Sequence, residues 1–200
     1  MSEYVVKKFP APLEAKVFLG GKEVAEIERS NDSTFTLTRQ SDSKKWVLSN
    51  RVHGQPRPFS LSVREAGAED MAGKSSHHDY LDLDDHSGDV LTINRHVFRH
   101  DGKFYMMTNK PAGHSPQSYL KGPRYISRLD NFPHEQLAEV GVHDRHGGSS
   151  HRLKRFRGVP VGEATGLGIS DTGHRVKVGA ELEDIGLFVA ASSYLMYAMA

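Results

Sequence analysis

The sequence predicts a mainly β fold with one buried hydrophobic helix at its C-terminus. Short apolar runs alternate with turn residues over most of the chain, and glycine is frequent, at 19 of 200 residues. The final 16 residues, from Ile185 to Ala200, carry no charge. A chain of this length fits one domain, residues 1–200, that buries roughly two thirds of its unfolded surface.

The N-terminal third shows the strand pattern most clearly. Ala15–Leu19 and Val24–Ile27 flank a Gly20-Gly21 pair, which predicts a β-hairpin with a tight turn. Alternating apolar residues continue this series at Phe35 and Leu37, at Trp46 and Leu48, and over Phe59–Val63.

Further strands are predicted after residue 80. An acidic turn divides Tyr80–Ile93 into two strands, and Thr92–Phe98 has a strand pattern of its own. The later candidates are Phe104–Met107 after an Asp101-Gly102 turn, Tyr125–Leu129, Leu137–Val142 (or a short helix from Pro133 to Val140), and pieces of Val159–Val178. Loops are expected at about 66–79, 109–124 and 143–157. About ten strands at this spacing favour a barrel or a sandwich.

The C-terminal segment is predicted to be a helix with no polar face. Three carboxylates in Glu181–Asp184 precede it, where a helix dipole favours anions. A helix that is apolar all round is buried in protein or in lipid. Its uncharged stretch is shorter than the ~20 residues that span a bilayer, so a core helix is favoured over a membrane anchor. Its expected core residues are Leu187, Phe188, Ala191, Leu195 and Met196.

Composition restricts the function classes. The formal net charge is only +1, which argues against a nucleic-acid binder. The chain has no cysteine, so disulfides, thiolate metal sites and cysteine nucleophiles are excluded. Residues 1–12 lack the apolar stretch of a signal peptide. We therefore expect a cytoplasmic or nucleocytoplasmic protein, peripheral at membranes where it meets them, with no transmembrane span.

No motif predicts catalysis, a metal or a cofactor. Asp82–Asp89 imitates part of a calcium loop, but an EF-hand frame fails at its glycine and glutamate positions. His96 and His100, if both lie on one strand, are ~13 Å apart, too far for one metal ion. The serines lack a nucleophile elbow, and the glycines of 162–168 match no phosphate loop and predict strand-to-strand turns.

The densest charge is the segment His151–Arg157, which interleaves four cations with two apolar residues. Such a segment is either a solvated loop edge, a protein contact, or a site for anionic headgroups. The best candidates for an anion or lipid contact are Arg152, Lys154, Arg155 and Arg157.

Two segments carry a family resemblance. Leu83–Arg95 resembles the strand, Asp-x-x-Gly turn, strand unit of the tubby C-terminal-like superfamily, which includes the LURP-one-related proteins and the phospholipid scramblases, and Glu183–Met196 is similar to its terminal helix. The resemblance implies a closed or nearly closed antiparallel β-barrel around a buried C-terminal helix. It also implies binding of phospholipid or protein rather than catalysis.

The chain departs from this superfamily in two respects. It has no cysteine, and so lacks the scramblases' cysteine-rich segment, and lipid scrambling is not carried over. The phosphoinositide-binding lysines and arginines of tubby proteins are not matched either. The functional expectation is a non-enzymatic binding or scaffold module that docks on anionic phospholipid headgroups or on a protein partner. The alternatives are a small β-barrel ligand carrier, an unrecognised enzyme or a membrane-anchored protein.

Overall fold

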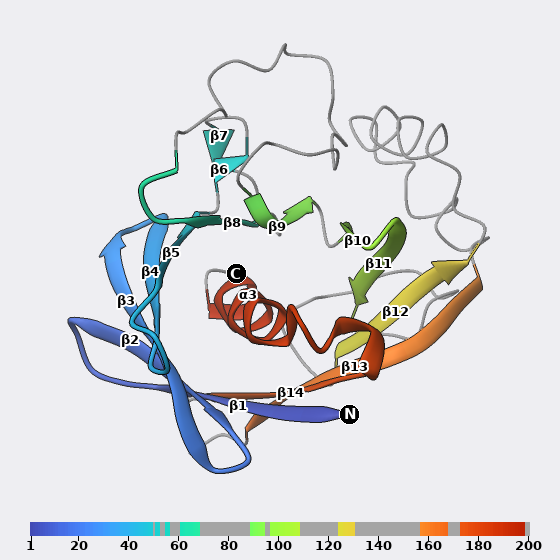
Figure 1. Ribbon diagram of the computed structural model, residues 1–200, viewed down its shortest axis with the longest axis horizontal. Helices are drawn as coiled ribbons and strands as arrows, with labels where there is room; N and C mark the ends of the chain where they lie inside the picture. The colour runs from blue at the N-terminus through green and yellow to red at the C-terminus, as the bar shows by residue number, and fades with distance from the viewer. Residues whose placement is uncertain are drawn as a thin grey trace.

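The computed structural model describes residues 1–49, 51–52, 55–56, 61–68, 89–94, 97–108, 124–130, 157–167 and 173–198. Within them, strands form a closed barrel around a single C-terminal helix (Figure 1). The barrel strands are β1 (Ser2–Lys8), β2 (Leu13–Leu19), β3 (Lys22–Asn31), β4 (Thr34–Arg39), β5 (Lys45–Ser49), β8 (Leu61–Glu65), β9 (Asp89–Asn94), β10 (Val97–His100), β11 (Lys103–Thr108), β12 (Arg124–Asp130), β13 (Arg157–Leu167) and β14 (Gly173–Val178). The other elements are β6 (Arg51–Val52), β7 (Gln55–Pro56), the 3-10 helix η2 (Ala180–Leu182) and α3 (Gly186–Ala198).

The barrel closes because its first and last strands pair with each other. Each barrel strand lies antiparallel to the next one along the chain, and β1 pairs both with β2 and with β14. Closure removes the free sheet edges that would otherwise invite aggregation. β6 and β7 form a separate two-stranded sheet. The predicted fold class, an antiparallel β-barrel around a buried C-terminal helix, is confirmed.

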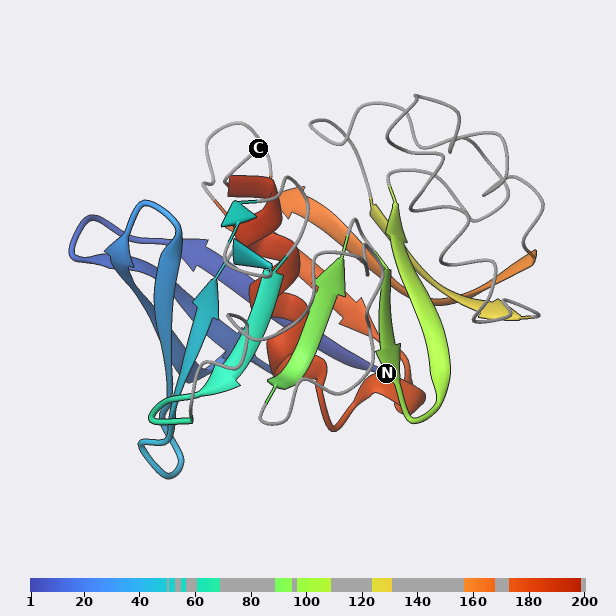
Figure 2. The same cartoon turned by 90° about the horizontal axis from the view of Figure 1, so that it is seen from above.

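The register defines two ends of the barrel. Ser2 lies opposite Val178, just before η2, so β1 begins at the end where the chain enters the barrel interior. We call this the entry end, and the opposite end, which holds the turn between Lys8 and Leu13, the exit end. The helix runs from one to the other (Figure 2).

Two predicted turns are confirmed. Gly20 and Gly21 join β2 to β3 with φ angles of 58° and 81°, the pattern of a type I′ turn. Asp101 and Gly102 join β10 to β11 with φ angles of 47° and 70°. Glycine and aspartate adopt this left-handed backbone at low cost, which explains why these residues mark the turns.

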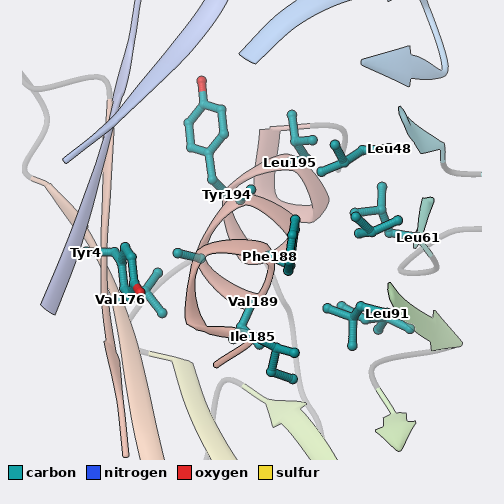
Figure 3. Close-up of a cluster of buried hydrophobic side chains, with 14 of the residues drawn as sticks. Tyr4, Leu48, Leu61, Leu91, Val176, Ile185, Phe188, Val189, Tyr194 and Leu195 are labelled. Atoms are coloured by element: carbon teal, nitrogen blue, oxygen red, sulfur yellow. The ribbon is translucent and has the colours of Figure 1, made fainter. Parts of the chain in front are cut away.

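The helix fills a space that strand side chains alone leave open. An eight-stranded barrel is about filled by its own side chains, and the diameter grows with the number of strands. A helix with its side chains is about 10–12 Å across, which suits a wider barrel. Figure 3 shows side chains of α3 between Tyr4 and Val176 on one side and Leu48, Leu61 and Leu91 on the other. The buried residues of α3 are Phe188, Val189, Ala190, Ala191, Ser192, Ser193, Tyr194, Leu195 and Met196, whereas Leu187 is partly buried.

The side-chain sizes place the helix off the barrel axis. α3 makes its closest backbone approach to β1 and β14, and its residues on that side are small. A Cβ on Gly186 would come within 2.9 Å of the Tyr4 ring, and Ser193 contacts His174 of β14. Elsewhere the barrel wall contributes large side chains, and Trp46 meets the edge of Phe188 at a centroid distance of 5.0 Å.

Several expectations need correction. β1 was not predicted from the sequence, and the helix begins at Gly186, so the carboxylates of Glu181–Asp184 lie before its first turn. Residues 162–167 belong to β13 and are not turns. Gly162 instead permits a close strand contact, because a Cβ there would lie 2.4 Å from the Lys177 carbonyl oxygen.

Other expectations change in their bounds or lie outside the described residues. Thr92–Phe98 is not one strand, since β9 ends at Asn94 and β10 begins at Val97. Arg124 and Arg157, the last residues of two expected loops, instead begin β12 and β13, and the rest of both segments lies outside the described residues. The strand proposed at residues 137–142 and the acidic turn at 82–88 lie outside the described residues.

Candidate functional site

The predicted anion contact is only partly described. Arg157 begins β13 opposite Asp130 of β12, whereas Arg152, Lys154 and Arg155 lie outside the described residues. Gly162 of β13 is level with Val178 of β14, so Arg157 lies at the entry end. Arg157, the last residue of the basic segment, is therefore at the end of the barrel where the helix begins.

A cluster of polar side chains fastens the entry to the helix. In η2, Glu181 accepts a hydrogen bond of 2.6 Å from Arg128 of β12. Tyr105 of β11 lies opposite Arg128 in the sheet, and its side chain is fully buried. Burial, and next the charge of the neighbouring Glu181, raise the pKa of Tyr105 to about 12. The phenol therefore stays neutral at physiological pH.

The two carboxylates that follow contact other strands. Glu183 accepts a hydrogen bond from the Ser2 hydroxyl of β1, and Asp184 lies 3.1 Å from His100 Nε2 of β10. Together with Glu181 they connect the segment before α3 to β1, β10 and β12. The acidic run that the sequence associates with the helix dipole thus serves to anchor the helix to the barrel wall.

A second polar cluster lies at the exit end, around Glu14. The register of β2 slips between Leu13 and Ala15, so Glu14 is the extra residue of a β-bulge. Glu14 is buried, and its carboxylate receives Arg29 Nε at 3.0 Å and the Tyr194 hydroxyl at 3.4 Å. Burial, and next the negative charge of Glu14, raise the pKa of Tyr194. The bulge therefore turns a carboxylate inward to hold the last turns of α3.

The buried pair His174 and Ser193 has the spacing of a base and a nucleophile. Nε2 of His174 lies 3.0 Å from Oγ of Ser193. Both residues are about 1% exposed, on the inside of the barrel. A nucleophile must reach its substrate, so this hydrogen bond fixes α3 against β14 instead of serving hydrolysis.

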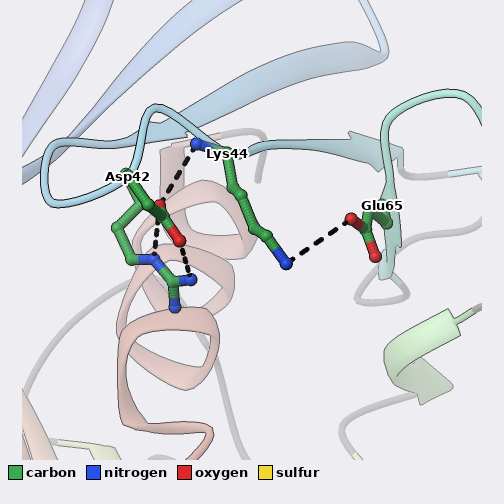
Figure 4. A network of polar contacts seen from close by, with 4 residues as sticks. Asp42, Lys44 and Glu65 are labelled. Carbon is green, nitrogen blue, oxygen red and sulfur yellow. Dashed lines mark hydrogen bonds and ion pairs between the residues drawn. The ribbon is translucent and has the colours of Figure 1, made fainter.

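Arginines cover aromatic rings of the core at both ends. Arg29 lies 5.2 Å from the centroid of Phe35, and Arg39 lies 4.9 Å from that of Trp46. Arg39 also holds Asp42, and its hydrogen bonds lower the pKa of that carboxyl to about 2. Figure 4 shows this network, in which Asp42 accepts from the Lys44 backbone and the Lys44 ammonium lies 3.9 Å from Glu65.

The described residues offer little for a metal ion. In the described part of the chain, no three His, Asp or Glu side chains are grouped to hold one. His100 is engaged by Asp184, and His96 lies outside the described residues. Nor is any described helix long and apolar enough to cross a bilayer.

Sequence reasoning missed the polar contacts that join the helix to the barrel wall. The contacts of Glu14, Tyr194 and His174 could not be predicted, because no sequence motif marks them. Glu14 lies in a bulge, Tyr194 lies in an apolar run, and His174 is a lone histidine. Comparison of the chain with protein families, curated proteins and solved structures gives no match.

Proposed function

We propose that this chain is a non-catalytic binding module of tubby C-terminal-like type that docks on anionic phospholipid headgroups. The family assignment is supported by the two segments that resemble that superfamily and by the layout of a closed barrel around a C-terminal helix. The docking function follows from this assignment and from the cationic segment at residues 151–157.

The observation that carries the proposal is the occupied interior. A ligand carrier holds its ligand in the mouth or interior of the barrel, in a space of several hundred Å³. Here Phe188, Val189 and Leu195 of α3 occupy the centre and are buried against the strands. A partner of this protein is then recognised from outside, by turns and outward-facing side chains.

The same observation weakens the enzymatic alternative. Within the described residues, the buried ionisable side chains Glu14 and His174 make hydrogen bonds to α3. These contacts stabilise the helix in the barrel. Binding of an anionic surface by cations on the outside of the barrel needs no internal pocket, and it depends mainly on the number and spacing of the cations.

The residues proposed for headgroup contact are Arg152, Lys154, Arg155 and Arg157. Each cation close to an anionic membrane contributes about 1 kcal/mol to binding, so four cations suffice for measurable, salt-dependent retention. All four belong to the segment that connects β12 to β13, and Arg157, where β13 begins, lies at the entry end of the barrel.

Vesicle sedimentation tests the proposal. The full chain is expected to bind vesicles that contain phosphatidylserine or phosphoinositide, to bind neutral vesicles weakly, and to be released by salt. Reversal of all four charges should weaken this retention. Equal retention of the charge-reversed and wild-type proteins would remove the proposed contact, and no retention of wild type would remove the function.

A further inference from the structure

The turn between β1 and β2 has an unusual chemistry for an exposed tip. Phe9–Leu13 contains no charged or hydrogen-bonding side chain, and Pro10, Ala11 and Pro12 are exposed. Phe9 and Leu13 at its base are partly buried. The turn lies at the exit end and projects from the body of the barrel (Figure 2).

The backbone of this tip has few N–H groups that must lose water. The two prolines have no N–H group, and the N–H of Phe9 donates to the Glu14 carbonyl at 3.0 Å. The carbonyl of Pro12 accepts from the N–H of Arg29 at 3.4 Å. Removing water from a backbone polar group is costly unless the group is hydrogen-bonded. This turn can therefore enter an apolar layer with fewer uncompensated groups than an ordinary turn.

The base of the tip contacts a group of charged side chains on β2 and β3. The ammonium of Lys16 lies 5.5 Å from the centroid of the Phe9 ring. Glu23 and Glu26 of β3 each hold that ammonium at 3.0 Å, and their hydrogen bonds raise the pKa of Lys16. Lys16 is thus paired with two carboxylates, and its ammonium lies beside the Phe9 ring.

Two further lysines flank the tip and remain available. Lys7 and Lys8 are exposed, and successive strand residues point to opposite faces, so they lie on either side of the turn. The Lys7 ammonium lies 5.4 Å from the Phe18 ring. Among the described residues, neither lysine has a carboxylate within ion-pair distance.

We propose that the Phe9–Leu13 turn is a membrane-contact tip, which inserts shallowly into an anionic phospholipid surface while Lys7 and Lys8 bind headgroups. An uncharged tip with a cationic collar is the pattern of peripheral interfacial anchors, in which apolar burial and headgroup attraction add. The inference rests on the proposed membrane docking but names a contact that the cationic segment does not include.

The charges favour a membrane over a protein groove. A protein partner for a short proline-containing turn supplies an aromatic-lined groove, which contacts the turn from one side. A membrane supplies anionic groups on all sides of the inserted tip, and this matches lysines that point to opposite faces. The tip and its collar are also at the opposite end of the barrel from Arg157, so the two contacts can be tested separately.

The test compares two matched charge reversals on vesicles that contain phosphatidylserine. Lys7→Glu with Lys8→Glu alters the exit end, and Lys22→Glu with Lys103→Glu makes the same change of charge at exposed positions of the entry end. At a factor of about 5 in affinity for each lysine removed, and more for a charge reversal, the exit-end variant should bind at least about 30-fold more weakly than wild type. The entry-end variant should lose much less.

Fluorescence tests insertion itself. The only tryptophan, Trp46, is 4% exposed in the core and should not be quenched by brominated lipids. Ala11→Trp adds a reporter at the exposed tip, and its emission should shift to the blue and be quenched when vesicles bind. Far-ultraviolet circular dichroism verifies that each variant is folded.

The outcomes separate the two proposals. Wild-type binding that the exit-end reversal leaves intact, or an Ala11→Trp reporter that stays unquenched on bound protein, would overturn the tip and leave the docking function standing. Failure of wild type to bind any anionic vesicle would overturn both. Loss in the exit-end variant alone, with quenching at position 11, supports the tip.

Discussion

Replacing Phe188 by alanine should loosen the contact between the helix and the barrel wall. Phe188 is 6% exposed, and its ring meets Trp46 of β5 at a centroid distance of 5.0 Å and an interplanar angle of 66°. This is an edge-to-face pair, the geometry that aromatic rings prefer. The substitution removes the ring from the centre of a closed barrel, whose paired strands cannot easily move inward to fill the gap.

The expected loss of stability is large. Truncation of a buried phenylalanine to alanine costs about 3–5 kcal/mol, transfer and cavity together. An edge-to-face pair adds about 0.5–1.5 kcal/mol beyond its buried area. Since the pair is part of the measured truncation cost, we expect about 4 kcal/mol in total, against a typical domain stability of about 5–15 kcal/mol.

Urea unfolding followed by the fluorescence of Trp46 measures this loss at the contact itself, because the chain has one tryptophan. The native emission should also change, since the ring beside the indole is gone. Leu187→Ala is the matched control on the same helix, and as Leu187 is only partly buried its loss should be less than half as large. A loss below about 1 kcal/mol for Phe188→Ala would mean that the helix does not fill the barrel as described.

Three further outcomes follow from the contacts. Asp42 should titrate near pH 2, below its usual 3.8, because Arg39 binds the carboxylate. The stability that this ion pair contributes is present above pH 3.8 and is lost as the pH falls to about 2. In the Arg39→Gln variant, the carboxyl chemical shift of Asp42 should titrate with a normal pKa. Tyr105 should ionise near pH 12, so the stability of the fold should fall as the pH rises from 10 toward 12. The absorbance of tyrosinate measures this ionisation. Ionisation of Tyr105 near pH 10 in the folded protein would contradict its burial. Gly186→Ala should cost about 1–3 kcal/mol by overpacking against Tyr4, and Tyr4→Leu should relieve part of this loss in a double-mutant cycle.

The parts of the fold that the sequence predicts are those with local causes. Gly20-Gly21 and Asp101-Gly102 mark turns because their backbone needs positive φ angles. The burial of the terminal helix follows from the absence of charge after Asp184. Each of these features depends on residues close together in the chain, so a single sequence is sufficient to identify it.

The parts that the sequence did not predict depend on distant partners. β1 has only two inward apolar residues, Tyr4 and Val6, and its pairing with β14 joins positions at the two extremes of the chain. The bulge at Glu14 is explained only by the tertiary contacts of its carboxylate with Tyr194 and Arg29. Likewise, the interruptions at Gly186 and Ser193 become meaningful as the small side of the helix only when β1 and β14 are known to face them.

The anchoring of the helix also decides where function can lie. Glu181 and Asp184 fasten the start of α3 to β12 and β10, while Glu14 holds its far end. Opening the interior would break both sets of contacts and expose the apolar helix to water, at a cost comparable to that of unfolding. Under the proposed docking function, recognition then falls to turns and outer faces, where no packing against the helix restricts the sequence and where the proposed collar of Lys7 and Lys8 can match an anionic surface.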